Sequence, residues 1–96
     1  LEGSGQYDEA ITSFERAIAF QPKFAPAWQG TGIALAKLSR YEEALTSFDR
    51  ALKLQPDDYR AWQNHGKALM GVCRYKDAIA SFDKVLALKP DSYKAW

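Results

Sequence analysis

The sequence has one cysteine and one histidine among 96 residues, and this scarcity excludes several kinds of site. Cys73 has no second cysteine in the chain with which to form a disulfide, so a reducing, cytoplasmic compartment is the default expectation. A structural zinc site takes four ligands, which His65 and Cys73 cannot supply. On one helix the two would lie about 12 Å apart, whereas a nucleophile and its base must approach to about 3 Å. We therefore expect no catalytic dyad, no metal and no cofactor.

Net charge and long apolar runs are also scarce. The 13 basic and 12 acidic residues leave a formal charge of +1, which favours neither nucleic acid nor a membrane as partner. No apolar run approaches the roughly 18 residues of a membrane-spanning helix, and no signal-peptide pattern is present. Aromatic residues make up 14% of the chain, but they fall at positions expected to pack in a core rather than to stack on bases.

What the sequence does contain is a repeat. Residues 25–58 and 59–92 align without gaps and are identical at 16 of 34 positions. The matched pairs include Trp28 with Trp62, Gly32 with Gly66, Leu35 with Leu69, Tyr41 with Tyr75, Ala44 with Ala78, Phe48 with Phe82 and Pro56 with Pro90. A fixed period of this length is the signature of a repeat array. We divide the chain into a partial repeat (1–24), two complete repeats (25–58 and 59–92) and the start of another (93–96).

Each repeat is expected to form two helices, because apolar residues recur at helical spacing over about 7–20, 26–38, 41–54, 59–72 and 75–88. Residues 1–6 are expected to be the end of an earlier helix followed by a turn. Gly32 and Gly66 fall mid-helix, where glycine costs about 1 kcal/mol relative to alanine. Their recurrence predicts a close approach between helices, with the small Ala44 and Ala78 facing them.

The pattern W-x3-G-x2-L, then Y-x2-A-x3-F and a closing P, resembles the tetratricopeptide repeat. The resemblance implies an all-α fold in which antiparallel helices A and B pair and stack as a right-handed superhelical α-solenoid. The chain departs from the family at Thr31 and His65, where an aliphatic residue is usual. We expect His65 to be a half-buried residue between helices. The run RYEEALTSFDRALKLQPDDYRAW is similar to long bacterial arrays of this family, so a fragment of such an array is expected.

A binding face is predicted on the A helices. Advancing about 100° per residue from the Trp of each A helix places a set of residues on the opposite face. In the second complete repeat these are Arg60, Asn64, Lys67 and Gly71, and in the first they are Pro26, Gly30, Ile33 and Lys37. The resemblance implies that A helices line a concave groove that holds extended peptides. The positions carried over are Gln29, Ile33, Arg60, Gln63, Asn64, Lys67, Met70 and Lys94. The basic members predict an acidic peptide or a free C-terminal carboxylate as ligand. The competing interpretation is that these are ordinary solvated helix charges.

The carboxylate clamp of some family members is matched only in part. Asn64 and Lys94 fit it, but Gln29 and Ile33 stand where a lysine and an asparagine are expected, so dedicated binding of chaperone tails is not expected. The predicted function is a non-enzymatic scaffold for protein–protein interaction. Two alternatives remain open. The chain could be an assembly element that self-associates end to end, or a targeting or regulatory domain of a larger enzyme.

Overall fold

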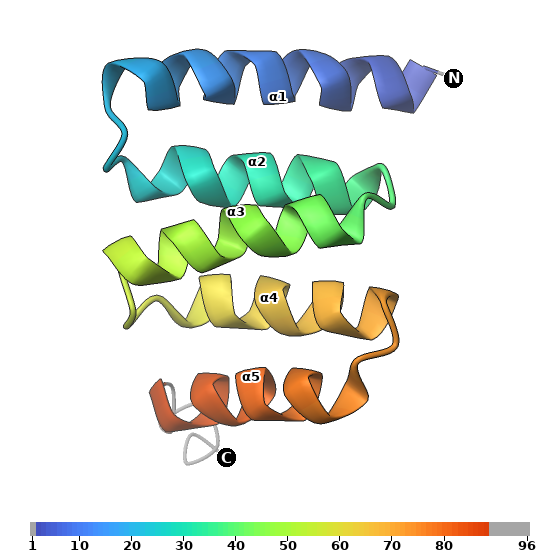
Figure 1. The fold of residues 1–96 in the computed structure, drawn as a ribbon, viewed down its shortest axis with the longest axis vertical. Helices are drawn as coiled ribbons and strands as arrows, with labels where there is room; N and C mark the ends of the chain where they lie inside the picture. Colours follow the sequence, from blue (N-terminus) through green and yellow to red (C-terminus); the bar gives the residue numbers. More distant parts are fainter. Residues whose placement is uncertain (1, 89–96) are drawn as a thin grey trace, which may run out of the picture.

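The computed structural model describes residues 2–88, which form five helices and no strand. They are α1 (Glu2–Phe20), α2 (Ala25–Lys37), α3 (Tyr41–Leu54), α4 (Tyr59–Gly71) and α5 (Tyr75–Leu88). The helices are stacked in chain order along the longest axis of the molecule, with α1 and α5 at its two ends (Figure 1). The predicted all-α solenoid of helix pairs is thereby confirmed. Lys94 and the start of the next repeat, 93–96, lie outside the described residues.

Contacts between helices are local along the chain. Each helix packs against the next one, and among the described helices α2 and α4 are the only second neighbours that also meet. This pattern is typical of repeat arrays, in which each unit touches only its neighbours. α2 and α4 are therefore the A helices of the two complete repeats, and α3 and α5 are their B helices.

The core is centred on α3, because that helix has a neighbour on both sides. Phe48 is 1% exposed and Ala44 is fully buried, and both pack in one cluster with residues of α2, α4 and α5. The residue of α1 equivalent to Phe48 is Phe14, which is only half-buried. Burial of the apolar stripe thus depends on how many helices flank it, since the repeated sequence supplies the same residue types in each unit.

The mid-helix glycines do allow a close approach, but the predicted partners were wrong. A Cβ atom added to Gly32 would lie 2.6 Å from the ring of Phe48, and one added to Gly66 would lie 2.9 Å from the ring of Phe82. Real Cβ atoms hardly ever come that close to a ring carbon. The phenylalanine of helix B, one helical turn beyond the predicted Ala44 or Ala78, therefore covers each glycine. A flat ring against a bare backbone fills this space better than a methyl group could.

The turn between helices A and B repeats as well. Ser39 and Cys73 have φ angles of 63° and 62°, in the left-handed region that residues other than glycine seldom adopt. The backbone amide of Arg40 donates to the carbonyl of Leu35 at 2.9 Å, and that of Ser39 donates to Ala36 at 2.9 Å. These two bonds form the Schellman motif that satisfies the last carbonyls of a helix.

The first helix is longer than predicted. α1 begins at Glu2 rather than near Tyr7, so the turn expected within residues 1–6 is absent from the described residues 2–6. Gly5 stands in register with Ser39 and Cys73, yet its φ is not positive. Continuing the helix through this position satisfies the backbone hydrogen bonds of the segment.

The tryptophan of each A helix donates a hydrogen bond to the loop that precedes the helix. Nε1 of Trp28 donates to the carbonyl of Pro22, and Nε1 of Trp62 donates to that of Pro56, both at 2.8 Å. A cation lies over each indole: the Arg50 guanidinium is 5.5 Å from the ring centre of Trp28. Lys84 has the same relation to Trp62 one repeat later. The indoles thus fix the loops between repeats.

Candidate functional site

The two A helices form the walls of a groove whose floor is α3. Since α2 and α4 both rest on α3 and meet each other in few places, a pocket of about 450 Å³ opens between them. We call it the A-helix pocket. It is lined by Ile33, Ala36, Lys37, Ser39, Tyr41, Phe48, Asn64, Lys67 and Ala68. Its volume lies within the range of small-ligand sites.

The structure brings together some of the predicted groove residues. Ile33, Asn64 and Lys67 all line the A-helix pocket. The other predicted positions on α2 and α4 do not line it, although they belong to the same two helices; they are Gln29, Arg60, Gln63 and Met70. Lys37 lines the pocket as well. Helical angles place it on the same face of α2 as Ile33, one helical turn later, although it is not among the groove positions carried over from the family.

Gln29 differs from the other predicted groove residues in its burial. Its side-chain oxygen is shielded from solvent and has no hydrogen-bond partner among the described residues. Buried polar atoms are nearly always paired, so this acceptor is an exception. In this arrangement Gln29 does not present its oxygen to the groove, whereas Gln63, one repeat later, is exposed.

Charge is segregated between the two kinds of helix. α2 and α4 contain no aspartate or glutamate, and their charged residues are Lys37, Arg60 and Lys67. The other helices carry nine acidic residues, four in α1, three in α3 and two in α5. These helices also carry five basic residues (Arg16, Arg50, Lys53, Lys76 and Lys84), so the formal charge is −3 for α1, −1 for α3 and zero for α5. The near-zero net charge of the chain therefore combines A helices whose charges are all basic with B helices of mixed charge.

The ion pairs of the described residues all lie outside the A-helix pocket. Arg40 binds Glu43 through two hydrogen bonds, Nε to Oε2 at 2.6 Å and a second nitrogen to Oε1 at 3.0 Å. Hydrogen bonding to Arg40 lowers the pKa of the Glu43 carboxyl below its ordinary value of 4.5. Arg74 pairs with Asp77 one repeat later, but there two guanidinium nitrogens contact the same oxygen, Oδ2, at 3.1 and 2.9 Å. No ion pair of the described part of the chain involves Lys37 or Lys67, so both ammonium groups lack an acidic partner there.

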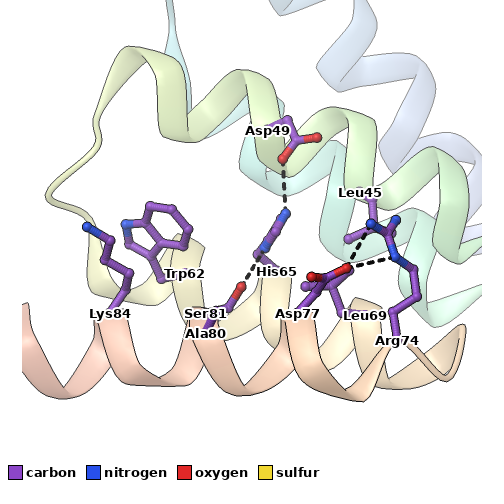
Figure 2. A pocket seen from close by; sticks show the side chains of 10 residues that line it. All are labelled: Leu45, Asp49, Trp62, His65, Leu69, Arg74, Asp77, Ala80, Ser81 and Lys84. Carbon is purple, nitrogen blue, oxygen red and sulfur yellow. Dashed lines mark hydrogen bonds and ion pairs between the residues drawn. The ribbon is translucent and has the colours of Figure 1, made fainter.

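A second pocket of about 450 Å³ lies on the other side of α4, between α3 and α5. Figure 2 shows His65 of α4 standing between Asp49 of α3 and Ser81 of α5. His65 Nδ1 is 2.8 Å from the Ser81 hydroxyl, and Nε2 is 2.9 Å from the Asp49 carboxylate. The ring of His65 also contacts Trp62 edge to face, with ring centres 5.9 Å apart. His65 is thus the half-buried residue that was predicted, with partners the sequence analysis did not identify.

The order Asp49–His65–Ser81 matches that of a catalytic triad, but its surroundings do not suit acyl transfer. Ser81 is 3% exposed, so its hydroxyl is closed off from a substrate. It also lies in the middle of α5, where backbone amides are engaged in the helix and cannot form an oxyanion hole. The two hydrogen bonds of His65 instead connect α4 to α3 and to α5. The sequence gives no local sign of these contacts, because both partners of His65 lie 16 residues away on other helices, whereas Cys73 lies on the same stretch of chain.

The described part of the chain offers neither a metal site nor a membrane-spanning helix. Residues 2–88 bring no group of three or more histidine, cysteine or acidic side chains together in a way that could hold a metal ion. The helices of this part of the chain are all too short or too polar to cross a membrane.

Comparison with known proteins gives the family. Two tetratricopeptide repeat models match the chain, one over residues 1–59 and the other over residues 59–92. The comparison with curated proteins gave no match. Among solved structures, the second TPR of Spaghetti (RPAP3), bound to the HSP90 peptide SRMEEVD, is 28% identical with a TM-score of 0.85. That match covers 88% of this chain and 79% of the other.

Two further structures share the fold. The first TPR of Spaghetti (RPAP3) superposes with a TM-score of 0.87 at 23% identity, over 90% of this chain and 68% of the other. The MamA protein superposes with a TM-score of 0.82 at 25% identity, over 92% of this chain. This chain spans about half of MamA, 48% of its length. The 34-residue period, the stacked helix pairs and the two family models agree, and the chain belongs to the tetratricopeptide repeat family.

Proposed function

We propose that the chain is a non-catalytic module that binds an extended peptide segment of another protein in the groove between α2 and α4. The observation that carries this proposal is the A-helix pocket, because it joins an open cavity to two lysines that have no ion-pair partner among the described residues. The competing interpretation, solvated helix charges, accounts for single lysines. It does not account for the exclusion of acidic residues from both A helices.

A peptide-bound relative supports the same use of the fold. The second TPR of Spaghetti (RPAP3) is bound to the HSP90 peptide SRMEEVD, which carries three acidic residues. By analogy, the groove of this chain would extend beyond the A-helix pocket along both A helices. Arg60, Gln63 and Met70 would then contact the peptide, and so would Gln29 after rotation of its side chain. Lys94, which lies outside the described residues, stays a predicted groove position. A cytoplasmic location, expected from the lone cysteine, remains a prediction.

The proposal is tested by selecting a phage-displayed library of random decapeptides on the immobilised chain. Selected peptides are then titrated into ¹⁵N-labelled protein, and amide shift changes are mapped by NMR. We expect the changes to cluster on α2 and α4 around Ile33 and Lys67. The double substitution Arg60→Glu and Lys67→Glu should abolish binding of acidic peptides without loss of helicity in circular dichroism. Shift changes confined to the pocket around His65, or full binding by the double variant, would contradict the groove assignment.

A second candidate function is end-to-end self-association, and the exposure of α5 favours it. Leu45 and Leu52 of α3 are 5% and 7% exposed, because α4 covers them. Their equivalents one repeat later, Ile79 and Leu86, are 60% and 44% exposed, and Tyr75 beside them is 56% exposed. α1, at the opposite end, also has a half-buried apolar stripe. A contact between two different faces is head-to-tail and can propagate into a stack.

Light scattering over a hundredfold concentration range tests this second candidate. We expect the mass to rise with concentration, and Ile79→Asp to restore a monomer. Ala80→Asp, which adds the same single negative charge at an exposed position of the same helix, serves as the matched control and should leave the association in place. A constant monomer mass would exclude self-association over that range.

A further inference from the structure

We propose that Lys37, Asn64 and Lys67 form a subsite for one carboxylate of the bound peptide, carried on an aliphatic stem as in a glutamate side chain. This inference rests on the proposed function and specifies the ligand of the A-helix pocket. None of the three residues is paired with an acidic side chain in the described part of the chain. Each contributes a hydrogen-bond donor, two as ammonium groups and one as an amide.

The two ammonium groups come from different helices. Lys37 lies in the last turn of α2, and Lys67 lies in the middle of α4, and both line the same pocket. Their charges repel across a pocket that holds no acidic residue among its lining side chains. An anion between them relieves this repulsion and gains charge-assisted hydrogen bonds from both sides, which are about twice as strong as those between neutral groups.

The rest of the pocket is mostly apolar. Its lining is completed by one polar residue, Ser39, and by Ile33, Ala36, Tyr41, Phe48 and Ala68. This surface suits the methylene groups of an acidic side chain, since burying each CH₂ group is favourable. A volume of about 450 Å³ leaves room for such a side chain and part of the peptide backbone. The combination of cations with an apolar wall therefore favours an organic carboxylate over a small hydrated anion.

The repeats explain why there is one such subsite between the two complete units. Lys37 aligns with Gly71 in the second unit, and Lys67 aligns with Ile33 in the first. Each unit thus supplies one lysine, at different positions of its A helix. The two lysines meet only where α2 faces α4. A bound peptide should accordingly show a requirement for acidity at a single position rather than a general preference for negative charge.

The carboxylate could come from an internal side chain or from the C-terminus of the peptide, and the test separates these sources. One phage library displays random decapeptides whose C-termini are joined to the coat protein, and a second displays them with free C-termini. Both are selected on the chain. We expect glutamate or aspartate to be enriched at one position in the joined library. Replacing that residue by glutamine in a synthetic, amidated peptide should weaken binding at least about tenfold in fluorescence polarisation.

Variants of the chain link this requirement to the pocket. Lys37→Met and Lys67→Met should each abolish the preference for glutamate over glutamine, while Lys37→Arg should retain it. Lys53→Met removes an exposed lysine of α3 and is the matched control, for which no change is expected. Thermal unfolding of each variant checks that the fold is intact, because Lys37 also complements the C-terminal end of α2.

Three outcomes would overturn the inference, and they differ from failure of the proposed function. Peptides that bind the groove without acidic enrichment, or with a preference that survives both lysine substitutions, would exclude the subsite while leaving peptide binding intact. Enrichment found only with free C-termini would assign the carboxylate to the chain end instead. If neither library yields a peptide that binds the chain, the proposed function itself fails, and the subsite with it.

Discussion

Nε2 of His65 lies 2.9 Å from Oδ1 of Asp49, and this contact joins α4 to α3 beside a pocket open to solvent. The opposite nitrogen of the same ring meets Ser81 of α5 at 2.8 Å. The two contacts differ in their surroundings. The Asp49 side chain is 64% exposed, while the bond to Ser81 is partly buried. One imidazole therefore links three helices, but its two bonds should differ in strength.

We expect Ser81→Ala to lower the free energy of unfolding by about 1 kcal/mol, the usual net contribution of a buried hydrogen bond. Asp49→Asn should cost less than about 0.5 kcal/mol, because exposed ion pairs contribute little. His65→Thr, which restores the residue type of the first unit, should cost at least as much as Ser81→Ala. Urea denaturation at pH 7 measures these differences. Asp83→Asn, at an exposed acid on α5, is the control, and a larger effect at Asp49 than at Ser81 would reverse this ranking.

The second prediction concerns the glycines under the phenylalanine rings. Gly32→Ala should destabilise the fold, because its Cβ would lie 2.6 Å from a ring that is 1% exposed and has no room to move. Gly66→Ala should cost less, since Phe82 is only half-buried and can shift by a few tenths of an ångström. Gly66→Leu should cost about 1–3 kcal/mol or more by overpacking.

Gly5→Ala is the matched control for these substitutions. Gly5 is helical and has no atom within 4 Å of an added Cβ, so alanine there should stabilise α1 by up to about 1 kcal/mol. Thermal unfolding of all four variants gives the comparison. If Gly32→Ala and Gly5→Ala changed the thermal stability equally, helix propensity alone would account for the effect of alanine at both positions.

The third prediction concerns the left-handed turn residues. Cys73→Gly and Ser39→Gly should each stabilise the protein by about 1 kcal/mol, because non-glycine residues are strained at φ near 62°. Cys73→Ala keeps the strain and should give no gain. The midpoint of thermal unfolding under reducing conditions measures the effect. A loss of stability in Cys73→Gly would indicate that the contact of its sulfur with the Tyr75 hydroxyl, at 3.4 Å, matters more than the backbone.

The fourth prediction concerns acid pH. The Arg40 guanidinium lowers the pKa of Glu43 in the folded state, so this pair stabilises the fold above the ordinary glutamate value of 4.5. That contribution is lost as the pH falls through the lower, folded-state pKa. NMR titration of the Glu43 carboxyl carbon should give a midpoint below 4.5, and Arg40→Gln should bring it back towards 4.5. An unchanged midpoint in Arg40→Gln would mean that another group holds the pKa down.

The sequence predicted most of the fold because the repeat shows twice which residues face inward. Trp28, Phe48 and the glycines recur at a fixed period, and helical spacing then gives five helices within a few residues of their observed ends. The errors have local physical causes. Periodicity identified Ala44 as a neighbour of Gly32, but only side-chain direction decides that the Phe48 ring covers it. At α1, the helix continues through Gly5, so the turn that was predicted within residues 1–6 is absent from the described residues 2–6.

The candidate site was less predictable, because pockets form between helices rather than along one. Helical angles correctly grouped Asn64 and Lys67 on one face of α4, and Ile33 on the facing helix. They also placed Lys37 on the same face of α2 as Ile33, but they could not show that it shares one pocket with Lys67, since that depends on how α2 and α4 are offset. The His65 contacts were missed for the same reason: Asp49 and Ser81 approach it from two other helices, at equal distances of 16 residues in opposite directions along the chain.

The separation of charge between A and B helices also determines how another macromolecule meets this one. The molecule is 24 Å across its shortest axis. At 0.1 M salt the field of a surface charge decays over about 10 Å, which is less than half that thickness. The electrostatic force on an approaching molecule therefore comes mainly from the nearest row of helices, and the overall charge of +1 has little effect on the rate of association. An acidic partner is attracted from the side of Lys37 and Lys67, where the A helices carry no acidic residue, so added salt should slow its association far more than it hastens its release.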